Sequence, residues 1–193
     1  MSLTSKRRFG PRNSEISHAI MDATEQVIRD EGYAAVSSRR VAEVAAIQQS
    51  LVYYYFESMD DLLVATFQRR TERGMARYEK DARSDKPVAA IWKDLNEGLD
   101  ARMSFAFVSL ASHNERVRDV YTRFLSQSRK LQADMIAKDA TARGIDISPA
   151  TPTALAFIIH STSLVMAREA ALGMTEGHDE VRSLLEGLLE KFA

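Results

Sequence analysis

Helical periodicity of apolar residues runs through almost the whole chain and limits the folds that are open to it. From about residue 14 onward apolar residues recur every three or four positions, and no segment alternates apolar and polar residues as a strand would. With 193 residues, 45% of them hydrophobic, the chain can form one large domain, or a small domain and a larger one. The pattern predicts an all-α protein.

Caps and breaks divide the periodic pattern into about nine helices. Short helices are expected at about 14–31, 38–45 and 49–56, and a fourth runs from Ser58, which begins a Ser-x-x-Asp capping pattern, to about residue 82. Pro87 begins a helix that reaches about residue 102, and further segments cover about 104–112 and 115–143. The last two helices are expected at about 149–172, with Ser148 as the N-cap, and at about 177–192.

The lengths of these helices predict two parts. Residues 1–57 hold the three short helices and form a compact head. Residues 58–193 form a bundle of longer helices, and the fourth helix joins the two parts.

Composition excludes several function classes. Cysteine is absent, which rules out disulfides, zinc-thiolate sites and thiol catalysis and fits a cytoplasmic protein. Residues 147–167 carry no Asp, Glu, Lys or Arg, but their two prolines and six Ser or Thr residues indicate a helix buried between other helices. We expect no membrane span, no cofactor and no metal. Gly-rich phosphate loops, nucleophile elbows and His-carboxylate metal spacings are all missing, so catalysis is not expected.

The second and third helices, joined by the tight connection AIQQ, have the layout of a helix-turn-helix DNA reader. The second helix of such a pair enters the major groove, where glutamine can pair with adenine and tyrosine can bond to phosphate. Its exposed face here is expected to carry Gln48, Gln49, Ser50, Tyr53 and Tyr54.

The stretch VAEVAAIQQSLVYYYFESMDDLL, preceded by GYAAVSSRRVA, resembles the DNA-binding region of the TetR family of bacterial transcriptional repressors. The match covers about residues 14–63, and the rest of the chain is similar in length and helix layout. The resemblance implies that Tyr53 bonds to phosphate or a base, and that the variable positions before it set sequence preference. The implied DNA contacts are Ser37, Arg39, Gln48, Gln49, Ser50, Tyr53, Tyr54 and Tyr55.

The head departs from the family pattern in ways that matter for binding. Ala46 replaces the usual turn glycine, Ser50 replaces another frequent glycine, and Met59 replaces a lysine that often pairs with phosphate. Residues 13–58 hold three arginines against seven acids, a net −4, while residues 1–12 hold four cations and no acid. We therefore expect the basic arm to supply phosphate attraction through Lys6, Arg7 and Arg8, by reaching into an adjacent minor groove.

The bundle is expected to dimerise and to bind a small-molecule effector. The last two helices offer an apolar surface for a second copy through Leu155, Ile158, Thr162, Val165, Val181, Leu184, Leu185 and Leu188. The middle helices are expected to enclose a pocket, with candidate lining residues Trp92, Phe105, Tyr121, Phe124, Phe157 and His160.

The resemblance implies a dimeric regulator, a repressor by analogy, that binds a palindromic DNA operator and is released by the effector. The missing lysine and the acidic head leave an alternative, a helical scaffold or sensor that has lost DNA binding.

Overall fold

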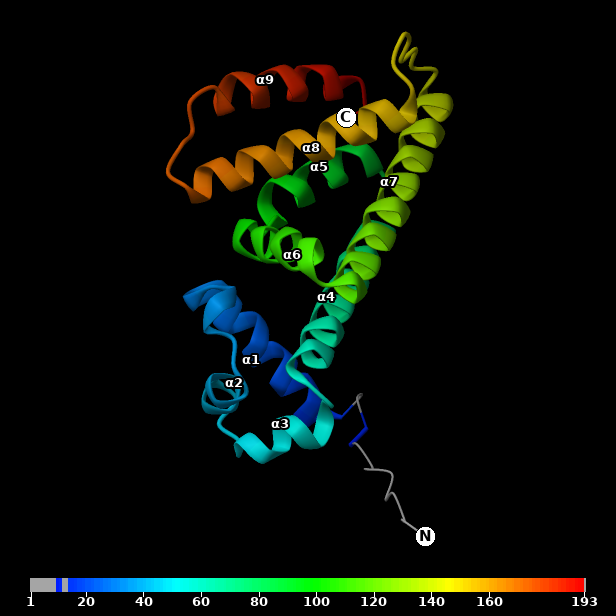
Figure 1. The fold of residues 1–193 in the computed structure, drawn as a ribbon. Helices are drawn as coiled ribbons and strands as arrows, with labels where there is room; N and C mark the ends of the chain where they lie inside the picture. Colours follow the sequence, from blue (N-terminus) through cyan, green and yellow to red (C-terminus); the bar gives the residue numbers. More distant parts are fainter. Residues whose placement is uncertain (1–9, 12–13, 193) are drawn as a thin grey trace.

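The computed structural model describes residues 10–11 and 14–192, and within these residues it contains helices and no strand (Figure 1). The head consists of α1 (Glu15–Glu31), a 3-10 turn η1 (Tyr33–Ala35), α2 (Ser38–Val44) and α3 (Gln49–Tyr55). The body consists of α4 (Met59–Asp81), α5 (Pro87–Gly98), α6 (Ala101–His113), α7 (Glu115–Arg143), α8 (Pro152–Ala171), α9 (His178–Leu189) and a final 3-10 turn η2 (Glu190–Phe192). The all-helical prediction is confirmed.

Serine side chains cap the first turns of α1, α2 and α4. Ser14 and Ser17 form a reciprocal capping box at the start of α1. The Ser37 hydroxyl accepts a hydrogen bond from the Arg40 N–H at the start of α2, and the Ser58 hydroxyl accepts one from the Asp61 N–H at the start of α4. Each bond satisfies a backbone donor that has no partner inside its helix, so the sequence itself sets these boundaries.

Three hydrophobic clusters follow one another along the long axis. The first lies among α1, α2, α3 and the start of α4, with Phe56 and Leu62 fully buried. The second joins α1 to α4, α6 and α7 around Phe67 and Phe107, whose rings lie 3.9 Å apart between centroids. The third lies among α5, α7, α8 and α9. In Figure 1, α4 and α7 run side by side from the head to the body, while α8 and α9 lie at the end farthest from α3.

Two predicted boundaries are wrong. The helix expected to continue to residue 102 ends at Gly98, and α6 begins at Ala101 because the Asp100 carboxylate accepts the Met103 N–H. The N-cap of α8 is Thr151 rather than Ser148, with Pro152 in the first turn. The segment SPATP contains two cap-proline pairs, and the helix uses the second.

Across residues 10–11 and 14–192, no helix combines the length and the apolar character needed to cross a lipid bilayer.

Candidate nucleic-acid interface and ligand cavity

The turn that leads into α3 is built on a left-handed alanine. Ala46 has φ 52°, its N–H donates to the Glu43 carbonyl, and the Ile47 N–H donates to the Ala42 carbonyl. These two bonds form a Schellman motif, which normally places glycine at this position. The chain therefore tolerates the strained conformation at the position where the family pattern has glycine, and α3 leaves the turn with one face free of the core.

The exposed face of α3 brings the expected residues together. Gln48 is the N-cap of α3, and its side chain makes no capping bond. Gln48, Gln49 and Ser50 are exposed, and the side chains of Tyr53 and Tyr54 remain 38% and 49% exposed. These polar and aromatic groups are therefore available to a partner, while Val52 on the opposite face is buried.

Ser38 links the start of α2 to α3, which the sequence did not indicate. Its hydroxyl, nearly buried, accepts hydrogen bonds from the Gln49 amide at 2.8 Å and from the Tyr53 hydroxyl at 3.0 Å. Hydroxyl hydrogens can rotate, so Ser38 can instead donate to Tyr53 and leave the tyrosine hydrogen for a phosphate oxygen. Ser38 thus fixes the position of two candidate DNA contacts.

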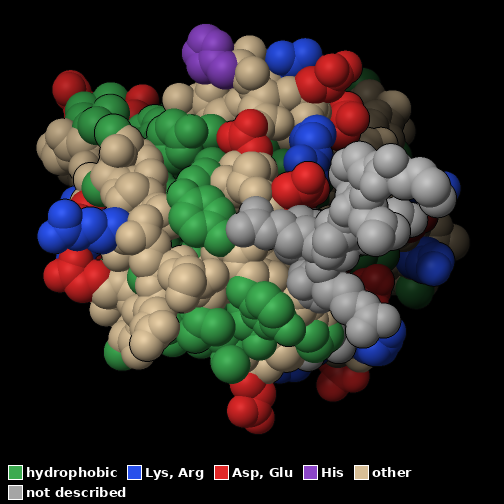
Figure 2. Space-filling model, turned by 60° about the horizontal axis from the view of Figure 1, so that its bottom comes forward, with side chains coloured by type: hydrophobic (Ala, Val, Ile, Leu, Met, Phe, Trp, Pro, Cys, Tyr) green, Lys and Arg blue, Asp and Glu red, His purple; other side chains and the backbone are tan. Residues whose placement is uncertain are grey.

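Cations are scarce on the head. Arg40 pairs with Glu31 and Glu43, and Arg29 pairs with Glu25 and Asp100. Arg39 is exposed and has no ion pair within the described residues. The exposed Ser37 lies at the same end of α2 and uses its oxygen to cap that helix. Figure 2 shows the face that contains the head, where the described side chains form no continuous basic patch.

The prediction that Tyr55 contacts DNA is wrong. Its ring is only 7% exposed and lies in the core of the head, edge-on to Tyr54 with the ring centroids 5.0 Å apart. Gly10 covers this pair, because its N–H donates to the Tyr54 carbonyl at 2.9 Å. A Cβ atom at Gly10 would lie 2.5 Å from Tyr55 Cε1, so only glycine fits there. Lys6, Arg7 and Arg8, assigned to the basic arm, lie outside the described residues.

A cavity of about 320 Å³ lies in the body, between the head and α8. Tyr121, Phe124 and His160 line it, as expected, together with Tyr78 and Phe107. Its volume is at the lower end of the range of about 300–1,000 Å³ that small-molecule sites occupy. Burial lowers the pKa of His160, and the charges of Arg129 and Arg168 lower it further, so the imidazole that lines the cavity is held neutral.

Three other residues predicted for the pocket lie elsewhere. Trp92 is buried in the core of the body, and its indole N–H donates to Glu186 of α9 at 3.5 Å. Phe105 is exposed on α6, under the guanidinium of Arg168. Phe157 is half exposed on α8, with the guanidinium of Arg129 4.6 Å from its ring centre. None of the three lines the cavity that holds His160.

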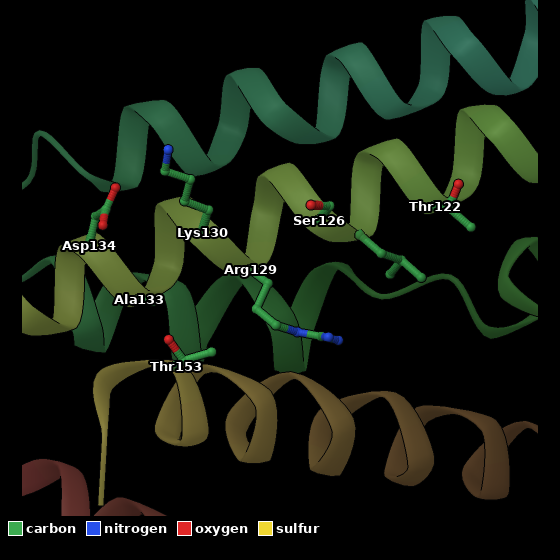
Figure 3. A pocket seen from close by; sticks show the side chains of 8 residues that line it. Thr122, Ser126, Arg129, Lys130, Ala133, Asp134 and Thr153 are labelled. Carbon is green, nitrogen blue, oxygen red and sulfur yellow. The ribbon is translucent and has the colours of Figure 1, made fainter.

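A second hollow lies between α7 and the start of α8, with a volume of about 500 Å³ (Figure 3). Exposed polar side chains dominate its lining, which consists of Thr122, Leu125, Ser126, Arg129, Lys130, Ala133, Asp134 and Thr153. It contains no aromatic wall, so it is a polar surface groove rather than an enclosed site for an apolar ligand.

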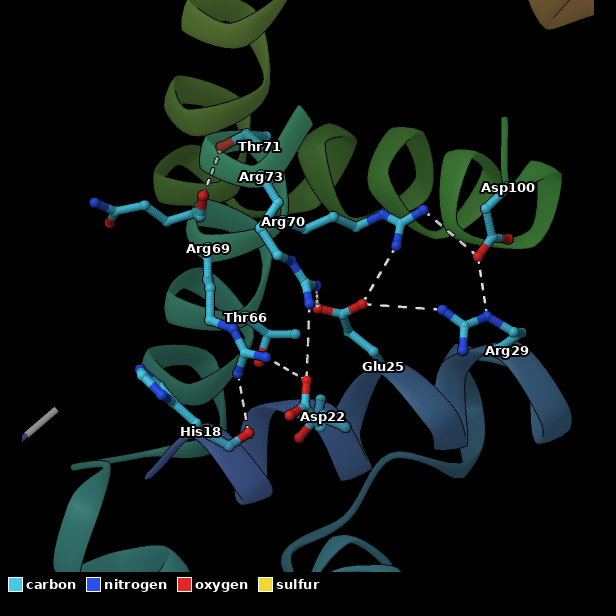
Figure 4. Close-up of polar contacts among 12 residues, drawn as sticks. His18, Asp22, Glu25, Arg29, Thr66, Arg69, Arg70, Thr71, Arg73 and Asp100 are labelled. Atoms are coloured by element: carbon cyan, nitrogen blue, oxygen red, sulfur yellow. Dashed lines mark hydrogen bonds and ion pairs between the residues drawn. The ribbon is translucent and has the colours of Figure 1, made fainter. Parts of the chain in front are cut away.

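Ion pairs join the head to the body (Figure 4), and most of the residues that form them also line the cavity that holds His160. The buried carboxylate of Glu25 on α1 pairs with Arg73 and with Arg70, the latter at 3.2 Å. Asp100, the N-cap of α6, pairs with Arg29 at 3.0 Å and with Arg70 at 3.5 Å. This network could not be predicted from the sequence, because arginines and acids on helices usually lie on a solvated surface.

Burial alone would raise the pKa of Asp100. The N–H of Met103, the hydrogen bond from Arg29 and the charge of Arg70 outweigh that effect, so the pKa of Asp100 lies below its usual range. Asp100 is therefore held as a carboxylate at the cavity mouth, where it competes with other anions for these arginines.

The predicted dimer surface divides into an exposed part and a buried part. Ile158 and Val165 on α8, and Val181, Leu184 and Leu188 on α9, are exposed apolar side chains. Leu185 is wrongly placed in this set, since it is 8% exposed and lies in the core of its own chain, and Leu155 packs against that same core. Thr162 is partly buried, and Phe157 adds an exposed ring to the face of α8.

Known proteins are similar to this chain in the helices of its head. The sequence pattern that defines "Bacterial regulatory proteins, tetR family" matches residues 20–66, from within α1 to the first turns of α4. The HTH-type transcriptional regulator BetI of Rhizobium meliloti (strain 1021) is 26% identical over 129 residues, which are 61% of this chain and 61% of that protein. The Fatty acid metabolism regulator protein of Bacillus subtilis (strain 168) is 29% identical over 62 residues, 32% of each chain. The matches thus span less than two thirds of either curated relative.

Structural similarity extends over nearly the whole chain. The crystal structure of a TetR transcription regulator from Haloarcula marismortui ATCC 43049 has a TM-score of 0.73 to this structure, with 20% sequence identity, and the alignment covers 91% of this chain and 96% of that chain. That likeness concerns the fold, a helix-turn-helix head on a helical body. Because the family pattern falls on the helices that form this head, residues 20–66 are a DNA-binding region of the TetR family of bacterial regulatory proteins, and the chain shares the fold of the TetR regulator from Haloarcula marismortui.

Proposed function

We propose that the protein regulates transcription by inserting α3 into the major groove of duplex DNA. The observation that supports this most strongly is the exposed face of α3, where two glutamines and two tyrosines project although none of them is needed in the core. Gln48, Gln49 and Ser50 would read base edges, and Tyr53 and Tyr54 would reach phosphate or thymine methyl groups. Ser37 and Arg39 would contact phosphate from the start of α2.

The acidic head requires a further source of attraction to DNA. Residues 13–58 carry a net −4, and Arg40 is already neutralised by two glutamates. The basic arm, with Lys6, Arg7 and Arg8, would supply that attraction. The contact of Gly10 with the tyrosines supports this role, because it brings the end of the arm to the last turn of α3.

A second copy of the chain would complete the DNA-reading unit. The exposed apolar side chains of α8 and α9 recur at helical spacing, and Figure 1 shows both helices at the end of the body away from the head. An apolar patch of this kind marks a protein–protein contact, and a two-fold dimer would present two copies of α3 to a palindromic operator.

The cavity beside His160 would hold a small-molecule effector. Its mouth is formed by α1, α4 and α6, so a ligand there would touch both the head and the body. Effector binding would change the angle between the two heads of the dimer and release the operator, and the regulator would act as a repressor.

Selection of duplexes from a random DNA pool by the full-length chain tests this function. We expect enriched sequences with two-fold symmetric half-sites whose centres lie about 34–36 Å apart or a multiple of that distance, bound by two chains. Gln48→Ala should change the preferred base within each half-site, and Gln26→Ala, on an exposed position of α1, should not. If nothing is enriched over a pool passed over the support without protein, the function fails and the scaffold alternative is favoured.

A further inference from the structure

The cavity next to His160 has two chemically different halves. Its inner wall is aromatic and apolar, formed by residues such as Tyr121, Phe124 and Leu164. Its mouth carries four arginines, Arg29, Arg70, Arg73 and Arg77, but only two carboxylates line it. With His160 held neutral, the charged side chains of the lining have a net charge of +2, but Arg77 also pairs with Asp94 and Arg73 with Asp22, just outside the lining. Such a site favours a ligand that is apolar at one end and anionic at the other.

Arg70 is the best placed of these cations to receive an anion. Its side chain is 25% exposed, and burial lowers its pKa although Asp100 and Glu25 act in the opposite direction. Its N–O distances to these two carboxylates are 3.2 and 3.5 Å, longer than the 2.7–2.9 Å of a well-formed guanidinium–carboxylate bond. Arg70 is thus desolvated but imperfectly paired, because Glu25 and Asp100 are held in place by other arginines (Figure 4).

We propose that the effector is an anionic amphiphile whose anionic group takes the place of Glu25 on Arg70, while its apolar or aromatic body fills the chamber beside Tyr121 and Phe124. This inference rests on the proposed effector site and adds the chemical class of its ligand. The anion forms the short, charge-assisted bonds that Glu25 and Asp100 cannot both make with Arg70.

Replacement of Glu25 by the ligand on Arg70 would also couple the cavity to the head. Glu25 lies on α1, and its partners Arg70 and Arg73 lie on α4. When a ligand takes over Arg70, α1 loses one of its ties to α4 and keeps those of Glu25 to Arg73 and of Asp22 to Arg69. Ligand binding therefore weakens the link between α1 and α4 without removing it.

Two fluorescent probes with the same aromatic body and different charge test the ligand class. The probe 1-anilinonaphthalene-8-sulfonate is anionic, and N-phenyl-1-naphthylamine lacks the sulfonate. We expect the wild-type protein to bind the sulfonate at least about tenfold more tightly, as a charge-assisted hydrogen bond to a desolvated guanidinium allows. Because no DNA is present, the result is independent of whether the protein binds an operator.

Substitutions with opposite expected effects locate the anion. Arg70→Met should weaken sulfonate binding about tenfold and leave the neutral probe unchanged, whereas Glu25→Gln should tighten sulfonate binding about threefold or more, because it removes the competing carboxylate. Arg83→Met, on an arginine whose side chain is 79% exposed and far from the cavity lining, is the matched control and should change neither probe.

Partial unfolding exposes apolar surface that binds both probes, so the neutral probe should bind Glu25→Gln as it binds the wild-type protein while sulfonate binding tightens. This selective change keeps the test valid if Arg70→Met folds poorly. Three results would overturn the proposal: equal binding of the two probes by the wild-type protein, no sulfonate binding, or weaker sulfonate binding by Glu25→Gln. If the protein selects no DNA but shows the predicted probe pattern, the ligand site stands and the proposed regulatory function fails. If it selects DNA but does not show the probe pattern, the regulatory function stands and only the proposed ligand class fails.

Discussion

Ala46 has a strained backbone conformation at the turn that leads into α3. Its left-handed backbone costs an L-residue with a Cβ atom roughly 1–2 kcal/mol, and the two bonds of the turn hold it there. The strained turn sets the direction of α3, and this direction exposes the face that carries Tyr53.

Ala46→Gly should therefore stabilise the protein. Glycine relieves the strain but gains entropy in the unfolded chain, so we expect a net rise in the free energy of unfolding of about 0.5–1 kcal/mol. Urea denaturation followed by circular dichroism measures it. Ala45→Gly is the matched control, since Ala45 has an ordinary right-handed backbone and should lose about as much stability as Ala46→Gly gains. A loss of stability in both variants would show that Ala46 is not strained.

Ser38→Ala should weaken DNA binding although Ser38 itself need not touch DNA. The substitution removes the common partner of Gln49 and Tyr53, so we expect a loss of affinity of about fivefold, the effect of one neutral hydrogen bond. Fluorescence anisotropy with the selected duplex measures it. In a Tyr53→Phe background the same substitution should cost less, because part of its effect acts through the tyrosine hydroxyl. Strictly additive losses would argue against this positioning role.

Helix ends were readable from the sequence because their chemistry is local. Ser58 and Pro87 each act within one turn of the helix that they begin, and the structure confirms both. The break between α5 and α6 was missed, although Gly98 and Asp100 are ordinary end and start residues, because the apolar period continues across them. Ser148 and Thr151 are each followed by a proline, so the local signal did not decide between them.

Residues that depend on contacts between distant helices could not be predicted in the same way. Tyr55 is covered by Gly10, a contact across more than forty residues, and the Glu25 network joins three helices. Phe105 and Phe157 looked like pocket residues because α6 and α8 are apolar on more than one side. Only the packing of these helices shows that both rings face outward, while Tyr121 and Phe124 face the cavity.

Helix α8 brings a titrating group to the cavity wall. The pKa of His160 is lowered by burial and by two arginines, so the folded protein resists binding a proton that the unfolded chain accepts below about pH 6.5. A depressed folded-state pKa contributes stability that is present above the unfolded pKa and is lost as the pH falls. The stability of the wild-type protein should thus decrease below about pH 6.5, with a contribution from His160 of at most about 1.4 kcal/mol per pH unit.

His160→Gln should remove this part of the pH dependence. Urea denaturation at pH 7.5 and at pH 5.5 gives the free energy of unfolding at each pH, and the difference should be smaller for His160→Gln than for the wild-type protein. His113→Gln, on an exposed residue, is the control and should keep the wild-type difference. An unchanged difference in His160→Gln would show that the imidazole is not shielded from protons.

The arrangement of the whole molecule separates three tasks along one axis. The face of α3 that we propose reads DNA lies at one end, and α8 and α9, with their exposed apolar side chains, lie at the other (Figure 1). The cavity with its four arginines is lined by helices between these ends and by α8. Helix α4 runs from the head into the body, and its Arg69, Arg70 and Arg73 pair with acidic residues of α1 in the head. A change in these ion pairs therefore alters the contact between the head and the body.

Leu184→Glu should dissociate the proposed dimer. Leu184 is 64% exposed in the single chain and would lie at the interface, and the two-fold symmetry buries two new charges at once. We expect dimerisation to weaken at least about 100-fold, as for loss of an interface hot spot. Sedimentation velocity over a range of concentrations measures it. Ile16→Glu, an exposed apolar position on α1, should leave the dimer intact, and an unaltered dimer in Leu184→Glu would place the interface elsewhere.

The most direct test of the account compares two tyrosines of equal exposure. Tyr53 on α3 and Tyr33 in η1 are 38% and 39% exposed, and each loses only its hydroxyl when replaced by phenylalanine. Anisotropy titrations with the selected duplex at fixed salt should show binding by Tyr53→Phe about tenfold weaker than by the wild-type protein, and no change for Tyr33→Phe. Wild-type affinity in Tyr53→Phe, or equal losses in both variants, would contradict the claim that this face of α3 binds DNA.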